Sequence, residues 1–323
     1  MLAITPMQKK IPCHIVTGML GAGKTTAILN YLDQKQDSEF TAVLVNDFGP
    51  NGIDSSVIRN ATNEKELEIV NIPGGCLCCS SDAQFNVALR KLIKNPMIDR
   101  IIIEPSGIVL LDNLVSSMQE LAQELPIQLA PIIMLVQPQA FNQLREKGIN
   151  YAVRLAERAN ILVANFEDTE NPIQLHKFLA WAQSLRPSKQ CILSTSYGKL
   201  PIDLFTHFIP SPNTQSSSST AKVTHPHFAD GLTFSQVHRF NLKLLIQLME
   251  KLIKRGIDGK NIQRLKGIFV TDSGSFLVEI ANSRVYHRTI EPICESKIDW
   301  ISDHPISIKT MKQHIKPTYT LGK

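Results

Sequence analysis

The sequence predicts an α/β fold in which helices cover both faces of a mainly parallel sheet, followed by a smaller C-terminal α+β domain. Two observations lead to this prediction. Strand-like apolar segments alternate with helical patterns over residues 11–205, and this alternation is typical of parallel βαβ units. A Ser-rich stretch then separates this part of the chain from a segment that begins with a long amphipathic pattern.

Six short apolar segments are the expected strands of the sheet, because each has the length and composition of a buried strand. They cover residues 11–17, 41–45, 100–103, 132–136, 161–164 and 190–193. Apolar residues at three- and four-residue steps predict helices between them. The clearest of these helices cover residues 25–32, 84–93 and 171–185.

A change in composition near residue 210 predicts the domain boundaries. Residues 1–209 are expected to form the first domain, 210–221 a Ser- and Pro-rich linker and 222–323 the second domain. In the second domain, residues 267–271 and 276–281 are expected to form a hairpin, to which 284–288 can add a third strand. A helix ended by Gly256 is predicted from the apolar positions Val237, Phe240, Leu244, Leu248 and Leu252.

Composition excludes several classes of protein. The chain has 323 residues, of which 43% are hydrophobic and 20% charged, so it is not intrinsically disordered. Its 34 Lys and Arg against 29 Asp and Glu give a net charge of +5, too weak and too dispersed to predict a nucleic-acid partner. No apolar run reaches the roughly 18 residues that cross a bilayer, and no signal-peptide core opens the chain, so we expect a cytoplasmic protein without membrane contact. Six cysteines are too few for a disulfide scaffold.

A Gly-rich loop between the first strand and the first helix is the strongest chemical signal. Residues 18–25 match the pattern G-x-x-x-x-G-K-S/T in full. Backbone N–H groups of such a loop surround phosphate oxygens, and the positive end of the helix dipole adds to the attraction. The alternative is a Gly-rich turn that matches by chance. The expected nucleotide-binding residues are Gly21, Ala22, Gly23, Lys24, Thr25 and Thr26.

Four residues have expected roles in phosphate chemistry on a P-loop NTPase sheet. Lys24 would bridge the β- and γ-phosphates, and the Thr25 hydroxyl would ligate Mg²⁺. Glu104 ends a buried strand, from which it would hold Mg²⁺ or position the attacking water. Gly107 follows closely and would bring a backbone N–H near the γ-phosphate, so Lys24, Glu104 and Gly107 are the candidate catalytic residues. The alternative for Glu104 is an ordinary acid at a strand end.

The segment after the fifth strand predicts how the base is read. Residues 165–168 resemble the guanine-reading pattern N-K-x-D, with Phe166 in place of the Lys. Asp168 can accept both N–H groups on the edge of guanine, which adenine does not present, and Asn165 belongs to the same pattern. Ser196, after the sixth strand, lies in a loop that can offer backbone N–H groups to the guanine oxygen. The alternative is an acidic loop without base contact.

Three cysteines lie within four residues, at Cys76, Cys78 and Cys79. Three thiolates and one further ligand suit tetrahedral Zn²⁺, and sulfur also binds Cu(I). The alternatives are buried free cysteines or a redox pair. The isolated cysteines at 13, 191 and 294 are expected to be structural, as is His14, and the pair at 225 and 227 is a weak signal for an accessory metal site.

Together these motifs resemble the CobW-like P-loop GTPases. The resemblance rests on the phosphate loop, on residues 45–49 and 53–54, on the Cys-x-Cys-Cys run, on residues 104–107 and weakly on 264–267. It implies a metal-linked GTPase, related to the urease and hydrogenase nickel-insertion GTPases, with GTP, Mg²⁺ and Zn²⁺ as ligands. It also implies a metal contact from Asp47, which stands where the family has Glu.

The resulting hypothesis is a GTPase that couples its nucleotide state to the binding of a transition metal, first of all zinc, and to its transfer to a client metalloprotein. GTP, GDP, the metal ion and the client are the expected partners. A homodimer is typical of related nucleotide switches, although no residue indicates it here. Two alternatives stay open, a P-loop ATPase or small-molecule kinase with structural cysteines and a zinc buffer that does not hydrolyse nucleotide.

Overall fold

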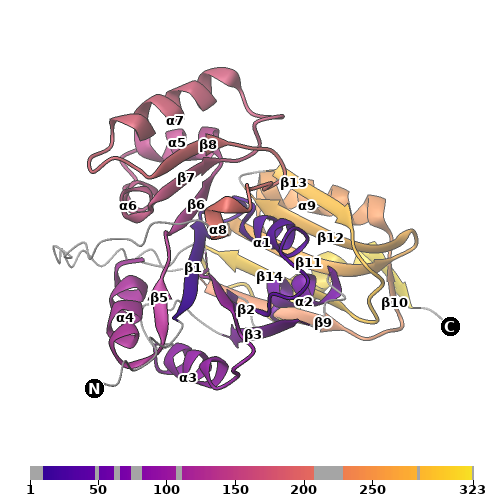
Figure 1. Cartoon of the computed structure of the whole chain (residues 1–323). Helices are drawn as coiled ribbons and strands as arrows, with labels where there is room; N and C mark the ends of the chain where they lie inside the picture. Colours follow the sequence, from indigo (N-terminus) through magenta and orange to yellow (C-terminus); the bar gives the residue numbers. More distant parts are fainter. Residues whose placement is uncertain are drawn as a thin grey trace, which may run out of the picture. The chain divides into compact units, whose positions relative to one another are not determined.

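The computed structural model describes residues 10–47, 51–61, 66–73, 82–106, 111–206, 228–281 and 284–321. These residues form two compact units (Figure 1). The first unit contains described residues 10–45, 66–72, 82–106 and 111–206. The second contains 46–47, 51–61, 73, 228–281 and 284–321.

The sheet of the first unit has the strand order β3-β2-β4-β1-β6-β7-β8, with β5 beside β1. Its strands are β1 (Ile11–Gly18), β2 (Thr41–Asp47), β3 (Leu67–Pro73), β4 (Arg100–Glu104), β5 (Ile127–Leu129), β6 (Ile133–Val136), β7 (Ile161–Ala164) and β8 (Cys191–Ser194). The pairs of β1 with β4, β5 and β6, and the pairs β2–β4, β6–β7 and β7–β8, are all parallel. This confirms the predicted sheet and its six predicted strands, while β3 and β5 were not predicted.

Helices cover both faces of this sheet, as predicted. They are α1 (Lys24–Leu32), α3 (Asp82–Ile93), α4 (Leu111–Glu124), α5 (Pro138–Glu146), α6 (Tyr151–Arg158), α7 (Pro172–Ser184) and α8 (Asp203–Thr206). Successive side chains of a strand point to opposite faces. Cys13 and Ile15 of β1 accordingly join a core cluster with Leu89 of α3 and Met118 of α4. His14 points to the other face, where its ring lies 5.2 Å from that of Phe205 in α8.

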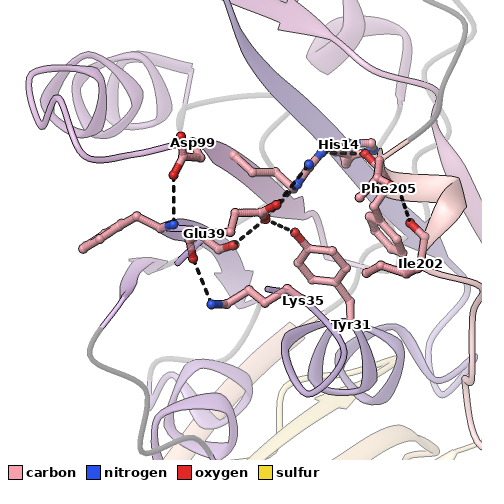
Figure 2. A network of polar contacts seen from close by, with 11 residues as sticks. His14, Tyr31, Lys35, Glu39, Asp99, Ile202 and Phe205 are labelled. Carbon is pink, nitrogen blue, oxygen red and sulfur yellow. Dashed lines mark hydrogen bonds and ion pairs between the residues drawn. The ribbon is translucent and has the colours of Figure 1, made fainter. Parts of the chain in front are cut away.

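A buried polar network lies where the parallel strands begin (Figure 2). Arg100, the first residue of β4, donates from Nε to Glu39 at 3.0 Å and from a terminal nitrogen to the Phe205 carbonyl at 2.6 Å. Tyr31 also donates to Glu39. Burial, together with the Arg100 charge, lowers the pKa of His14 to about 3. His14 is therefore neutral at physiological pH, and the network fastens α1 and α8 to the sheet.

The second unit contains a mixed sheet of seven strands in the described part of the chain. The strands are β9 (Phe228–Phe234), β10 (His238–Phe240), β11 (Ile262–Thr271), β12 (Gly274–Ala281), β13 (Arg284–Thr289), β14 (Ser296–Ser302) and β15 (Tyr319–Leu321). The order is β13-β12-β11-β10-β15, and β14 pairs with both β11 and β9. The helices are α2 (Ile53–Ala61), α9 (Leu242–Arg255), α10 (Ile308–Ile315) and the 3₁₀ turn η1 (Lys316–Thr318). Its core centres on Phe240, Met249, Phe269 and Trp300.

The predicted helix of the second unit was placed too early in the sequence. Phe240 is a fully buried residue of β10, and Val237 is half exposed in the turn before it. The helix α9 begins at Leu242 because the Asn241 side chain accepts a hydrogen bond from the Leu244 N–H at 3.0 Å. Gly256, at φ 61°, ends it as predicted. The hairpin and its third strand are confirmed as β11, β12 and β13.

The two units are interleaved in the sequence, which its composition does not reveal. The helix α2 follows β2 of the first sheet along the chain, yet its residues belong to the second unit. The boundaries at 209 and 222 fall within residues 207–227, outside the described part, and stay a proposal. None of the helices in the described ranges combines the length and the apolar character that crossing a membrane needs.

Candidate nucleotide-binding site

The Gly-rich loop has the strand–loop–helix setting that its sequence predicts. It connects β1 to α1, and Lys24 is the first residue of α1. Gly23 has φ 95°, and a Cβ there would lie 2.4 Å from the Asn165 side-chain nitrogen. A Cβ on Gly18 would lie 2.3 Å from the Leu135 carbonyl oxygen. Both positions therefore require glycine, because the loop lies directly against β6 and the segment that follows β7.

Lys24 is turned toward its own loop. Its ammonium donates to the carbonyl oxygens of Gly18 at 3.3 Å and Met19 at 3.2 Å, and the residue is 7% exposed. A buried ammonium held by neutral carbonyls is placed to exchange them for negatively charged oxygens, which bind it more strongly. The arrangement suits a lysine that binds phosphate.

Thr25, in the first turn of α1, and Glu104, at the carboxyl end of β4, come together. The Thr25 hydroxyl donates to Glu104 Oε1 at 2.9 Å, and Glu104, the last residue of β4, is 3% exposed. Hydroxyl and carboxylate oxygens are the ligands that Mg²⁺ prefers. This donor set therefore fits Mg²⁺. The pairing brings together two of the residues that the sequence proposed for this ion.

Ser106 follows β4 and belongs to the stretch 104–107, for which the sequence analysis assigned roles to Glu104 and Gly107 only. It is 6% exposed, and its Oγ has no hydrogen-bond partner in the described part of the chain. The residue lies two positions after Glu104. Burial of a short hydroxyl residue cannot be read from local sequence, so the motif alone could not single it out.

Asn165 connects the Gly-rich loop after β1 to the loop that follows β8. Its side-chain nitrogen donates to the Ala22 carbonyl at 2.9 Å, and its side-chain oxygen accepts the Gly198 N–H at 3.0 Å. Asn165 is 1% exposed. Two loops that are far apart in the sequence are thereby held in one arrangement.

Asp168 and Ser196 also lie together. The Asp168 N–H donates to the Ser196 hydroxyl at 3.0 Å, and Asp168 itself is exposed. Phe166 adopts a left-handed backbone with φ 68°, and Glu167 donates its N–H to the Thr195 carbonyl at 3.0 Å. Sequence reasoning placed Ser196 beside the base through its backbone. The structure adds a side-chain role, because its hydroxyl supports the loop that carries Asp168.

The remaining candidate residues are not tested by the structure. Cys76, Cys78, Cys79 and Gly107 lie outside the described residues, as do the histidines at 225 and 227. Asp47 is the last residue of β2, and its side chain is likewise not described. Among the described residues no three His, Cys, Asp or Glu side chains are close enough to hold a metal ion. Thr26 lies in the first turn of α1.

The isolated cysteines differ in exposure. Cys13 is fully buried, and burial raises the pKa of its thiol. Cys191 is partly buried on β8, and Cys294 is exposed. The expectation of a structural role agrees with the burial of Cys13 and His14, both of which are 0% exposed.

A parallel sheet with a Gly-rich loop after β1, a lysine at the start of α1 and a buried acid at the end of β4 defines a P-loop nucleotide-binding protein. Residues 12–193 match the family described as "CobW/HypB/UreG, nucleotide-binding domain". The chain belongs to this family, which confirms the resemblance found from the motifs.

Curated relatives carry zinc-related names. The chain is 32% identical over 221 residues to "Zinc chaperone YeiR" of Escherichia coli (strain K12), covering 66% of this chain and 62% of YeiR. It is 38% identical over 116 residues to "Zinc chaperone CobW" of Pseudomonas aeruginosa, covering 34% of this chain and 31% of that protein. The matched segments thus span less than two thirds of either relative.

A solved structure, "Crystal structure of Zn(II)-bound YjiA GTPase from E. coli", aligns with 96% of this chain and 99% of its own. The sequence identity is 17% and the TM-score 0.44.

Proposed function

We propose that this chain binds and hydrolyses GTP and couples its nucleotide state to the binding of a transition metal, zinc first, and its delivery to a client metalloprotein. The observation that carries the nucleotide part is Asn165, which joins the phosphate loop to the loop beyond β8. The family and the zinc-related names of the relatives support the metal part.

The phosphate half of the site has three proposed participants. Lys24 would leave the carbonyls of its loop and bind the β- and γ-phosphate oxygens. Thr25 and Glu104 would hold Mg²⁺, which neutralises charge on the phosphates. Glu104 would also orient a water molecule, and the Gly107 N–H would complete the γ-phosphate contacts.

The base half of the site is proposed to select guanine. Asp168 is exposed, so its carboxylate is accessible to the two N–H groups of the guanine edge. Adenine would leave that carboxylate without its partners, which costs affinity. The Ser196 hydroxyl accepts the Asp168 N–H, and the Asn165 side chain accepts the Gly198 N–H, so hydrogen bonds hold the loops after β7 and β8 together.

Coupling is proposed to run through the segment between β2 and α2. In the chain this segment leaves the nucleotide-binding sheet after Asp47 and reaches an anchored helix of the second unit. Asn51 donates to Asp299 at 2.7 Å and to the Ile298 carbonyl at 3.2 Å. Asp54 forms a buried ion pair with Lys266. Because Asn51 and Asp54 are anchored in this way, a nucleotide-dependent change in the conformation of the segment would also move α2 in the second unit.

The same segment and the cysteine run are proposed to respond to the metal together. Cys76, Cys78 and Cys79 would bind zinc as cargo, with Asp47 as a further contact, and metal would favour the GTP-bound arrangement. Linkage then requires that GTP raises zinc affinity by the same factor by which zinc raises GTP affinity. The identity of the client and a homodimeric arrangement stay predictions.

The proposal is tested by titrating fluorescent GTP and ATP analogues, with Mg²⁺, into the metal-free and the zinc-loaded full chain. We expect preference for GTP, strengthened by zinc, and loss of binding in Lys24→Ala. Cys78→Ser should remove the zinc effect while leaving GTP binding by metal-free protein intact. Cys294→Ser, which changes an exposed cysteine outside the run, is the matched control.

Three results would count against the proposal. Preference for ATP would favour the ATPase or kinase alternative. Tight zinc binding without nucleotide affinity would favour the zinc buffer. Equal GTP affinity with and without zinc would separate the cysteines from the nucleotide cycle.

A further inference from the structure

Tyr197 lies beside the proposed base-reading carboxylate, in the loop that follows β8. The interaction of its phenol with the Asp168 carboxylate raises the pKa of the phenol, and the preceding residue, Ser196, accepts a hydrogen bond from the Asp168 N–H at 3.0 Å. The residue is 66% exposed. The sequence analysis gave it no role, since a tyrosine before a glycine carries no motif of its own.

The backbone of Tyr197 is in the left-handed region, at φ 58°. An aromatic residue is uncommon there, because its Cβ crowds the following carbonyl. Neighbouring contacts hold the conformation in place. The Tyr197 carbonyl accepts a hydrogen bond from the Asn30 side chain of α1 at 2.7 Å, and the next residue, Gly198, donates its N–H to Asn165 at 3.0 Å.

The loop is also packed closely on the helix that carries the phosphate-binding residues. A Cβ added to Gly198 would lie 2.9 Å from the backbone nitrogen of Ala27 in α1. The residue that follows Tyr197 is thereby held against the first half of α1. The exposed ring nevertheless buries little apolar surface, so core packing does not account for an aromatic residue at a strained position.

We propose that Tyr197 is a positioning residue for the guanine base of the nucleotide. Its hydroxyl holds the Asp168 carboxylate in the orientation that meets the two guanine N–H groups, and its ring offers a flat surface to the base. A carboxylate has about four lone-pair sites, so two guanine N–H groups and one phenol can bind to it at the same time. The inference rests on the proposed function, because it takes Asp168 as the base-reading residue.

Two substitutions separate the two parts of this role. Tyr197→Phe keeps the ring and removes the hydroxyl, so GTP affinity should fall about tenfold, as expected for a hydrogen bond to a charged group. ATP affinity should stay unchanged, because adenine brings no pair of N–H groups to Asp168. Tyr197→Ala also removes the ring, and should weaken GTP and ATP binding alike by roughly a further fivefold or more.

The measurement is nucleotide binding to the full chain by fluorescence titration, with inosine triphosphate as a third ligand. Inosine lacks the exocyclic amine, so Tyr197→Phe should reduce its affinity less than that of GTP. Ile173→Ala is the matched control, since Ile173 is an exposed large side chain of the same unit, on α7. It should leave all three affinities unchanged.

The outcomes distinguish this inference from the proposed function. If the wild-type chain prefers GTP and both Tyr197 variants bind all three nucleotides as it does, the inference is wrong and the proposed function stands. An equal loss of GTP and ATP affinity in Tyr197→Phe would also overturn it, because a hydroxyl that orients Asp168 must act selectively. A wild-type preference for ATP would overturn both.

Discussion

Removing the charge of Asp54 should loosen α2 from the sheet of the second unit. The side chains of Asp54 and Lys266 are each 7% exposed and form an ion pair. The Arg264 guanidinium lies 3.4 Å from the same Asp54 carboxylate and 3.2 Å from the Glu279 carboxylate, so two acids and two bases form one buried to partly buried group. Asp54→Asn keeps the shape of the side chain while removing its charge, which leaves Lys266 without its direct partner.

The expected cost follows from the burial of this group. Breaking a buried pair by removing one partner typically costs about 3–5 kcal/mol. Glu279 still faces Lys266 and Arg264, so the lower end, about 3 kcal/mol, is expected. In Asp54→Asn/Lys266→Met both charges are absent, and an apolar side chain in place of a buried charge is often tolerated. The double variant should therefore be more stable than the sum of the single effects predicts, by about 1–3 kcal/mol.

The effect should not depend on pH near neutrality. Burial lowers the pKa of Lys266, but the charges of Asp54 and Glu279 raise it by more, so the net shift is upward. A raised lysine pKa contributes stability that is fully present below the unfolded value of about 10.4 and is lost only as pH rises through the higher folded value. Between about pH 6 and 9 the stability difference from wild type should thus be constant.

Hydrogen exchange of the full chain, read by mass spectrometry, is the assay, because it reports on α2 locally. Peptides covering residues 51–61 should exchange faster in Asp54→Asn, while peptides from β1 and β4 should not change. The control is Asp258→Asn, an exposed aspartate in the same unit whose φ of 50° asparagine tolerates. Wild-type exchange in α2, or a destabilisation below about 1 kcal/mol, would refute the anchoring role of the pair.

Three further predictions concern the first unit. The hydrogen bonds from Arg100 and Tyr31 outweigh burial and lower the pKa of Glu39, so its stabilising contribution is present above the unfolded pKa and is lost as pH falls through the folded value. Urea unfolding from pH 7 to 3 should consequently show a weaker acid dependence in Glu39→Gln than in wild type. Asn165→Ala removes both hydrogen bonds that join the two loops, so titrations should show GTP and ATP each binding about tenfold or more weakly. A loss of affinity for only one of the two nucleotides would contradict this role. Gly198→Ala should lower the melting temperature more than Gly148→Ala, since both have positive φ but only Gly198 has backbone within 3 Å of the added Cβ; equal shifts would argue against close packing on α1.

Sequence alone predicted those parts of the fold that local patterns determine. The strands of the first sheet are runs of apolar residues. The conformation of the Gly-rich loop was predictable from its glycines, two of which lie against Asn165 and Leu135 in the structure. The hairpin of β11 and β12 was predictable for the same reason, because its turn residues stand between two apolar segments. Phe240 misled the helix prediction, since one apolar residue fits a helical step and a strand equally well.

Contacts between distant segments were beyond the reach of such patterns. Nothing around Asp54 indicates that its partner is Lys266, 212 positions away in the sequence, or that α2 belongs to the second unit. The interaction between the Tyr197 phenol and Asp168 is hidden likewise, because it depends on how two loops are held by Asn165. The motif indicated where the candidate site lies, and these contacts show how its loops are held.

Phe166 is the position at which the chain departs from the guanine-reading pattern, and the structure indicates why the loop keeps its shape without the lysine. The Phe166 carbonyl accepts N–H hydrogen bonds from Thr169 at 3.0 Å and Glu170 at 2.8 Å, which close the turn from within. The Asp168 N–H is held by Ser196 at 3.0 Å from the neighbouring loop. Since backbone and hydroxyl groups supply the support, the residue at 166 is not needed to brace Asp168. Under the proposed function, selectivity for the base then depends on how the Asp168 carboxylate is oriented, and the Tyr197 phenol is a described group that interacts with that carboxylate.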